Sequence, residues 1–210
     1  MRVAILSESP ADEAAVRILV EAVLEHPIEP VEIRFRKAGG IDAVLSVLAP
    51  ALKWLHYRRE AEGLVVVVDS NSTPTHTGAL DQPCDRADTC RLCRARGIIA
   101  GVNGSLSPMP SLGPVKTAVG LAVPAIEAWY LCGENPNVSE KAWDRALRER
   151  RFPYTREDLK REVYGSDRYG IALETKCAAR EMRRVVADLV QLERKFPQGF
   201  GSLLSNLREW

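Results

Sequence analysis

Three acidic residues follow predicted β-strands, at positions where α/β proteins commonly hold metal ions. Asp69 directly follows the most apolar run of the chain, while Glu8 and Glu127 come shortly after two other apolar runs. These runs cover residues 3–6, 64–68 and 118–123. Strands of a parallel sheet end at one rim, where the three carboxylates would repel one another unless a cation shared them. Such hard oxygen ligands suit Mg²⁺ or Mn²⁺, and Asn71 could add a neutral oxygen.

Helix capping is the competing explanation for acids at these places. Carboxylates near a helix N-terminus accept hydrogen bonds from free backbone N–H groups and interact favourably with the helix dipole. Capping fully accounts for Asp12 and Glu13, at the start of a predicted helix. It explains Glu8, Asp69 and Glu127 less well, because it requires three coincidences.

A second constellation contains three cysteines and one histidine. Its members are His76, Cys84, Cys90 and Cys93. A two-residue gap lets two thiolates turn toward one ion, and structural zinc requires four such ligands in a tetrahedron. The fourth ligand could instead be another cysteine of the chain or come from a partner subunit; the other cysteines are Cys132 and Cys177. Unligated thiols on a surface loop are the alternative to zinc, and a redox Cys-x-x-Cys pair is disfavoured because no thioredoxin-like βαβ context surrounds it.

Basic residues gather in two places. Around the cysteines they are Arg86, Arg91, Arg94 and Arg96. In the C-terminal part they are Arg145, Arg148, Arg150, Arg151, Arg156, Lys160 and Arg161. Acids interleave the second group, which is typical of a solvated helix face, so the first group is the better nucleic-acid candidate. Lys176 and Arg180, one helical turn apart, could also face a phosphate.

The pattern of apolar residues indicates an α/β fold with a mostly parallel sheet and helices on both faces. The three apolar runs are typical of buried strands, whereas strict alternation at 31–35 indicates a half-exposed strand nearer an edge. Apolar residues recurring every three or four positions predict helices at about 12–26, 41–55, 125–131, 139–151, 155–163, 174–195 and 200–209. Residues 98–102 fit a strand or a helix, and Pro124 is placed to open the helix at 125–131.

No clear linker divides the chain. We expect an α/β domain over residues 1–135 with a cysteine-rich insertion near 76–97, and a helical extension over 136–210 packed on the same domain.

Composition indicates a globular protein without a membrane segment. The 29 basic and 28 acidic residues nearly cancel, so overall charge gives no argument for nucleic acid. No apolar run approaches the roughly 20 residues needed to span a bilayer. Five cysteines, three of them crowded together, fit reduced thiols better than a disulfide framework, which predicts a cytoplasmic location.

Three segments together resemble the Toprim family. Residues 3–13 (VAILSESPADE) are similar to its opening strand ending in Glu, and residues 65–71 (VVVVDSN) to its Asp-x-Asp strand end. Residues 124–131 (PAIEAWYL) are similar to a Pro-x-x-Glu-x-Trp-Leu-Leu segment of small stand-alone Toprim-like proteins, many of them associated with phage-defence or mobile-element loci. The resemblance covers about residues 1–132. It implies a Toprim/Rossmann-like sheet, distantly similar to that of OLD-type nucleases.

What the resemblance implies is Mg²⁺-dependent phosphodiester chemistry at Glu8, Asp69 and Glu127. We therefore predict a nuclease or related protein in phage defence, with nucleic acid and a protein such as an ATPase subunit as partners. Two positions differ from the family pattern: Ser9 replaces a glycine, and Asn71 replaces the second acid. They leave open a non-catalytic subunit, or a zinc-supported binding module of a defence complex.

Overall fold

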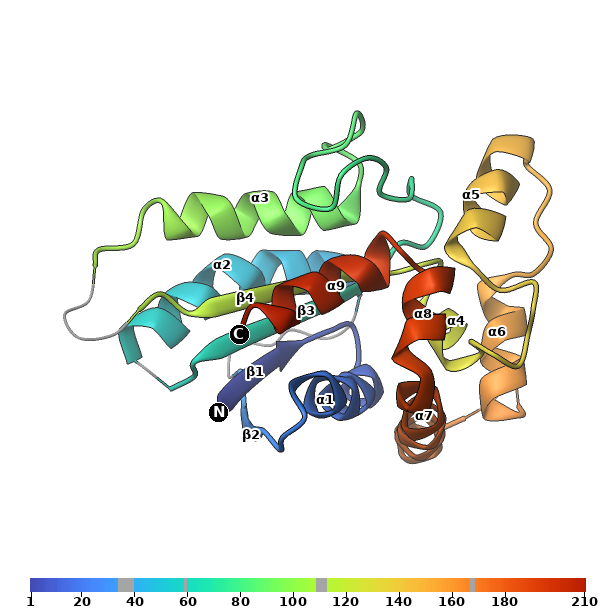
Figure 1. Ribbon diagram of the computed structural model, residues 1–210, viewed down its shortest axis with the longest axis horizontal. Helices are drawn as coiled ribbons and strands as arrows, with labels where there is room; N and C mark the ends of the chain where they lie inside the picture. Colours follow the sequence, from blue (N-terminus) through green and yellow to red (C-terminus); the bar gives the residue numbers. More distant parts are fainter. Residues whose placement is uncertain (34–39, 59, 109–112, 167–168) are drawn as a thin grey trace.

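The computed structural model describes residues 1–33, 40–58, 60–108, 113–166 and 169–210 (Figure 1). Its centre is a four-stranded sheet with the order β2-β1-β3-β4, and all neighbouring strands pair in parallel. The strands are β1 (Arg2–Leu6), β2 (Glu29–Val31), β3 (Gly63–Asp69) and β4 (Lys116–Ala122). The predicted α/β fold with a parallel sheet is confirmed.

The extent to which each strand is buried accounts for how apolar its residues are. Every residue of β3 is buried, because this central strand has a neighbour on each side and helices on both faces. The edge strand β2 is short and mostly exposed, as expected for a strand of mixed polarity. It begins two residues earlier than the strand predicted at 31–35, of which residues 34 and 35 lie outside the described part of the chain.

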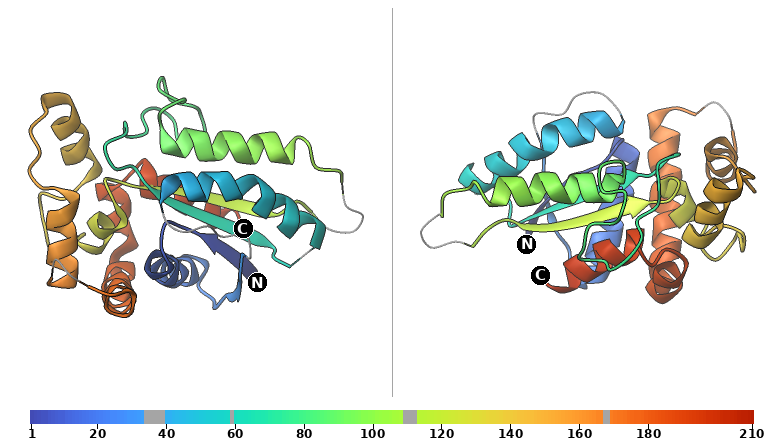
Figure 2. Two further views of the ribbon diagram at one scale, coloured as in Figure 1. Left: turned by 180° about the vertical axis from the view of Figure 1, so that it is seen from behind. Right: turned by 90° about the horizontal axis from the view of Figure 1, so that it is seen from above.

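Helices cover both faces of the sheet (Figure 2). On one face α2 and α3 pack together against β3 and β4, and on the other α1 and α9 pack against β1 and β4. The helices are α1 (Pro10–Leu24), α2 (Ile41–Arg58), α3 (Arg91–Asn103), α4 (Ile126–Tyr130), α5 (Glu140–Glu149), α6 (Arg156–Tyr164), α7 (Ile171–Val185), α8 (Leu189–Lys195) and α9 (Gly199–Arg208), with a 3₁₀ turn at Val186–Asp188. None of the described helices is long and apolar enough to cross a membrane.

Two local predictions are refined. Residues 98–102 belong to α3, which begins at Arg91 and therefore includes the end of the cysteine-rich insertion. The helix predicted at 125–131 begins only at Ile126, with Ala125 as its N-cap. Pro124 lies before the cap, joined to Val123 by a cis peptide bond, and does not open the helix.

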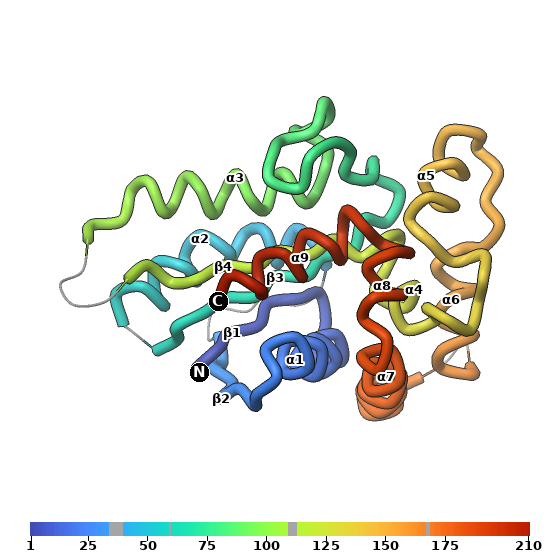
Figure 3. The backbone as a smooth tube through the Cα atoms, in the orientation of Figure 1, coloured from blue at the N-terminus to red at the C-terminus, as the bar shows by residue number. Residues whose placement is uncertain are grey.

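The C-terminal helices return to the sheet instead of standing apart. Helix α7 packs across α1, and α9 runs along β4, where the Ser202 hydroxyl donates to the Val119 carbonyl at 2.7 Å. Gly120 allows this close approach, since a Cβ atom there would lie 3.2 Å from the Leu203 side chain. The tube trace follows this return, with the chain ending beside the start of β3 (Figure 3).

Candidate functional site

The predicted acids meet at a cavity of about 170 Å³. It lies beyond the carboxyl ends of β1 and β3, where the strand order reverses direction, the usual ligand position in open parallel sheets. Its lining carries five carboxylates, from Glu8, Asp12, Asp69, Glu127 and Glu174, and two basic groups, from Arg156 and Lys160. Two larger hollows, of about 650 and 550 Å³, lie away from these carboxylates, at the amino ends of the strands and beside β2.

Hydrogen bonds tie the carboxylates to the sheet. The Asp69 backbone N–H donates to Glu8 Oε1 at 3.0 Å, which links the end of β3 to the loop after β1. Asp69 Oδ1 accepts from the backbone N–H of Ile126, the first residue of α4, also at 3.0 Å. These contacts place Glu8, Asp69 and the start of α4 together, as predicted from the strand ends.

Glu127 is the most deeply placed acid of the cavity, with 3% of its surface exposed. Its Oε1 atom accepts a hydrogen bond from the Tyr164 hydroxyl at 3.0 Å. Its Oε2 atom is buried and has no hydrogen-bond partner among the described residues. A buried oxygen without a partner is costly, so this atom indicates room for a ligand or a cation at the cavity.

Three basic side chains enter the same region. Arg156 pairs with Asp69 Oδ2 at 2.8 Å, and Lys160, one turn further along α6, lies 3.8 Å from Glu127 Oε1. Arg91 donates to the Asp69 carbonyl oxygen at 2.6 Å and lies 3.9 Å from Glu8. The prediction of a solvated helix face is wrong for Arg156 and Lys160. Their four-residue spacing on one helix was the available signal, but nothing in the sequence shows that this face turns inward.

The carboxylates still outnumber these cations, and their mutual repulsion contributes to raised pKa values of Asp69 and Asp12. Burial, followed by repulsion from Glu8 and Glu127, raises the pKa of Asp69 well above its ordinary value. Burial and the Glu127 charge raise the pKa of Asp12 to about 7. Asp12 is not the helix cap, because Ser9 Oγ accepts the Asp12 backbone N–H at 3.1 Å. Its carboxylate lines the cavity instead.

Asn71 does not line this cavity. Its backbone has φ of 52°, and its N–H donates to the Pro124 carbonyl at 2.8 Å. Its carbonyl oxygen accepts from Trp143 Nε1 at 3.2 Å. The structure therefore gives Asn71 a turn-forming role between β3 and α5, and the predicted extra metal ligand is not among the lining residues.

The second constellation forms a compact cluster that could hold a metal ion. The ligand atoms of His76, Cys84, Cys90 and Cys93 all lie within 4.8 Å of one another, a condition that no other His, Cys, Asp or Glu group meets in the described ranges. His76 Nδ1 lies 3.4 Å from Cys93 Sγ and 3.8 Å from Cys90 Sγ, and the sulfurs of Cys84 and Cys93 are 3.5 Å apart. A tetrahedral zinc site has S···S edges of about 3.8 Å and S···N edges of about 3.6 Å. The cluster is therefore compatible with structural Zn²⁺.

The surrounding groups favour imidazole ligation, while the three thiols differ. His76 Nε2 lies 3.2 Å from the Ala79 carbonyl, the kind of contact that fixes the other ring nitrogen for a metal. Burial acts to raise the pKa of the Cys84 thiol, but hydrogen bonds from the Arg86 backbone and the neighbouring thiols outweigh it, so that this pKa is lowered. Burial raises the pKa of the Cys90 and Cys93 thiols. All five cysteines of the chain are free thiols, and Cys132 and Cys177 lie outside this cluster.

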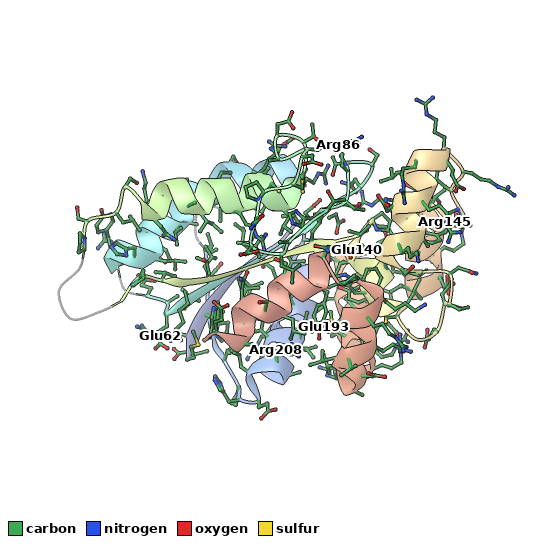
Figure 4. All side chains as sticks on the ribbon, turned by 45° about the horizontal axis from the view of Figure 1, so that its top comes forward. Glu62, Arg86, Glu140, Arg145, Glu193 and Arg208 are labelled. Atoms are coloured by element: carbon green, nitrogen blue, oxygen red, sulfur yellow. The ribbon has the colours of Figure 1, made fainter. Side chains whose placement is uncertain are left out.

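The arginines around the cysteines do not form one exposed surface. Arg86 and Arg94 are exposed, and Figure 4 shows Arg86 on the loop above α3. Arg91 turns inward to Asp69, and Arg96 donates to Ser202 Oγ at 2.7 Å. Only two of these four arginines, which were all predicted to contact nucleic acid, therefore face solvent.

Lys176 and Arg180 lie one turn apart on α7, as predicted, and both are exposed. Arg180 pairs with Glu181 at 2.6 Å. Their helix packs across α1, on the side of the molecule away from the cysteine loop (Figure 1).

No family model matches the chain, and no curated protein or solved structure matches it at a significant level. The resemblance to the Toprim family stays a prediction from the residues.

Proposed function

We propose that the cavity at the carboxyl edge of the sheet binds Mg²⁺ or Mn²⁺, and that the chain is a Toprim-like, metal-dependent nuclease or a related phosphodiester-processing protein. The main support is that five carboxylates and two basic side chains converge on one small cavity, where Glu127 Oε2 is buried without a partner. Carboxylate oxygens suit the cation, and basic side chains beside them suit a phosphate.

The residues that line the cavity would have different roles according to their positions. Glu8 and Asp69 would hold the cation with help from Glu127, and Arg156 would leave its 2.8 Å contact with Asp69 to meet a phosphate oxygen. A bound Mg²⁺ supplies Lewis-acid polarisation of the phosphoryl group. Asp12, with a pKa of about 7, is suited to accept or return a proton near neutral pH. Lys160 can stabilise negative charge on the phosphate from the same face of α6.

Metal titration with parallel cleavage assays tests this proposal. Mg²⁺ or Mn²⁺ is titrated into the protein by calorimetry, for the parent, Glu8→Gln and Asp69→Asn, and labelled DNA and RNA are added to the same samples. Glu62→Gln is the matched control, because Glu62 is an exposed acid at the other end of the strands. We expect binding and cleavage in the parent and the control and loss of both in the site variants. Absence of divalent binding in the parent would reject the proposal.

We propose zinc as the ion of the His76, Cys84, Cys90 and Cys93 cluster, with a structural role. Four protein ligands would fill a tetrahedral zinc site and leave no open position for catalysis, which is typical of structural sites. Metal analysis of the purified protein should find one zinc per chain. Protein purified with intact thiols but no bound metal would contradict this assignment.

A non-catalytic binding module is the second candidate. The absence of Asn71 from the cavity lining removes one oxygen ligand, and the direct Arg156–Asp69 pair lowers the negative charge offered to a second cation; both favour this candidate. Ser9 acts as a helix cap where the family has glycine, so the backbone there is less open to a phosphate. Divalent-ion binding without cleavage of any nucleic acid would favour this candidate. A role in phage defence and an ATPase partner are proposals from the resemblance alone.

A further inference from the structure

Helix α5 presents a strongly basic outer face. Lys141, Arg145 and Arg148 are spaced four and three residues apart, which places them on one side of the helix, and all three are exposed. Trp143 and Ala146 occupy the opposite, buried side. Figure 4 shows Arg145 projecting outward from this helix.

The basic face continues past the end of α5. Arg150 and Arg151 are also exposed, and the five residues together are called the α5 basic face. Arg148 pairs with Asp144 at 2.7 Å while its side chain stays 72% exposed. The other four have no carboxylate within ion-pair distance in the part of the chain that the structure describes. Within residues 141–151 these five cations outnumber the carboxylates of Asp144 and Glu149, so the segment forms a local positive field on a nearly neutral protein, and such a field attracts a polyanion.

Two hydrogen bonds fix this face relative to the carboxylate cavity. Trp143 Nε1 donates to the Asn71 carbonyl at 3.2 Å, and the Thr75 hydroxyl donates to Asp144 Oδ1 at 3.0 Å. Both partners lie in the segment that directly follows Asp69. The next helix, α6, brings a further cation to the cavity, because its first residue is Arg156, which lines the cavity.

An exposed aromatic residue directly follows the α5 basic face in the chain. Phe152 is 46% exposed, and the centre of its ring lies 5.1 Å from that of Trp143, on the buried side of α5 and not among Lys141, Arg145 and Arg148. An exposed ring that follows Arg151 in the chain suits single-stranded nucleic acid, since any unpaired base can stack on the ring.

We propose that the α5 basic face and Phe152 dock single-stranded nucleic acid and direct its backbone toward the carboxylate cavity. This proposal rests on the proposed function only for what happens at the cavity; docking itself needs neither the metal nor cleavage. It goes beyond the predicted solvated helix face, with which the exposure of these arginines agrees.

Fluorescence anisotropy with labelled oligonucleotides, without added divalent cation, tests the docking. The variant Lys141→Gln/Arg145→Gln/Arg148→Gln is compared with Lys53→Gln/Arg183→Gln/Arg194→Gln, which removes the same charge from exposed positions on other helices. We expect the first to bind at least about tenfold more weakly, and its slope of log K against log salt to fall by about 2, near 0.7 for each lost phosphate contact. The control should match the parent.

Two further variants separate this docking proposal from alternatives. Phe152→Ala should weaken binding of single strands about tenfold and leave duplex binding nearly unchanged, because only an unpaired base can stack. Asp69→Asn is assayed for cleavage alone: docking is measured without divalent cation, so loss of cleavage in that variant would concern the proposed function and not the docking.

Three outcomes would overturn the docking proposal. They are no nucleic-acid binding by the parent, equal weakening in the two triple variants, and tighter binding of poly-glutamate than of single strands, which would indicate an acidic protein partner.

Discussion

Removing a ligand of the cysteine–histidine cluster should loosen the start of α3 while leaving the sheet intact. Cys90 and Cys93 flank Arg91, whose guanidinium donates to the Asp69 carbonyl. The segment between Asn71 and Cys90 contains turns but no strand or helix, so the cluster is its main internal tie. Cys93→Ser therefore releases this segment and the anchoring of Arg91 together.

The expected size of the effect follows from the loop that a metal ion in this cluster would close. Linking His76 to Cys93 closes 18 residues, counted from 76 to 93. Loop-closure entropy for a link of that length stabilises the folded state by roughly 3 kcal/mol. This value is a lower limit, because zinc coordination in small sites contributes about 10–16 kcal/mol. A loss of 3 kcal/mol corresponds to local opening that is roughly 10²-fold more frequent.

Hydrogen exchange followed by mass spectrometry measures this opening directly. We expect amides of residues 76–93 to exchange at least about 10²-fold faster in Cys93→Ser than in the parent, with little change in β3 and β4. Cys177→Ser is the matched control, because Cys177 is an equally buried thiol outside the cluster. Equal exchange in the parent and Cys93→Ser, or the same acceleration in the control, would refute the reasoning.

Three further predictions concern charge and packing. Arg156→Gln leaves Asp69 without its cation, so the melting temperature should fall in the absence of divalent ions and recover with Mn²⁺ by more than the parent gains, whereas equal Mn²⁺ shifts would contradict the site. Burial raises the pKa of Glu140 from 4.5 to about 7, so its contribution is fully present below pH 4.5 and falls by roughly 3 kcal/mol as the pH rises through 7. Urea denaturation at pH 5 and pH 8 should show this loss in the parent and a flatter profile in Glu140→Gln. Gly199→Ala would press a Cβ atom against a carbonyl oxygen of β4 and destabilise the protein by about 1–3 kcal/mol, whereas Gly101→Ala, with open space around it, should be neutral or stabilising in thermal unfolding.

Buried strands and amphipathic helices were predicted well because their patterns are local. The apolar run at 64–68 became the fully buried β3. The strand predicted at 31–35 was misplaced, because the edge strand covers Glu29–Val31 and shares only Val31 with it. Helix boundaries were less accurate. Residues 98–102 were ambiguous since a short apolar run fits either state, and contacts with α2 and β4 decide for a helix.

Some site residues could likewise be predicted from a local pattern and others could not. The two-residue gap between Cys90 and Cys93 indicates a pair of metal ligands, whereas the roles of His76 and Cys84 depend on how a turn-rich loop folds. Arg91 sits in a cluster of arginines, and only its contact with Asp69 separates it from its exposed neighbour Arg94.

The sequence alone determined the α/β class, the three strands after or at whose ends Glu8, Asp69 and Glu127 lie, and the candidate ligands of a metal cluster. These features follow from residue type and short-range periodicity, which the chain carries locally. Tertiary structure decided which face of α6 turns inward, so that Arg156 and Lys160 join the acids, and which face of α5 stays in solvent. Both depend on contacts between segments more than 50 residues apart, such as the hydrogen bond from Trp143 to Asn71, and no local pattern encodes a contact of that range.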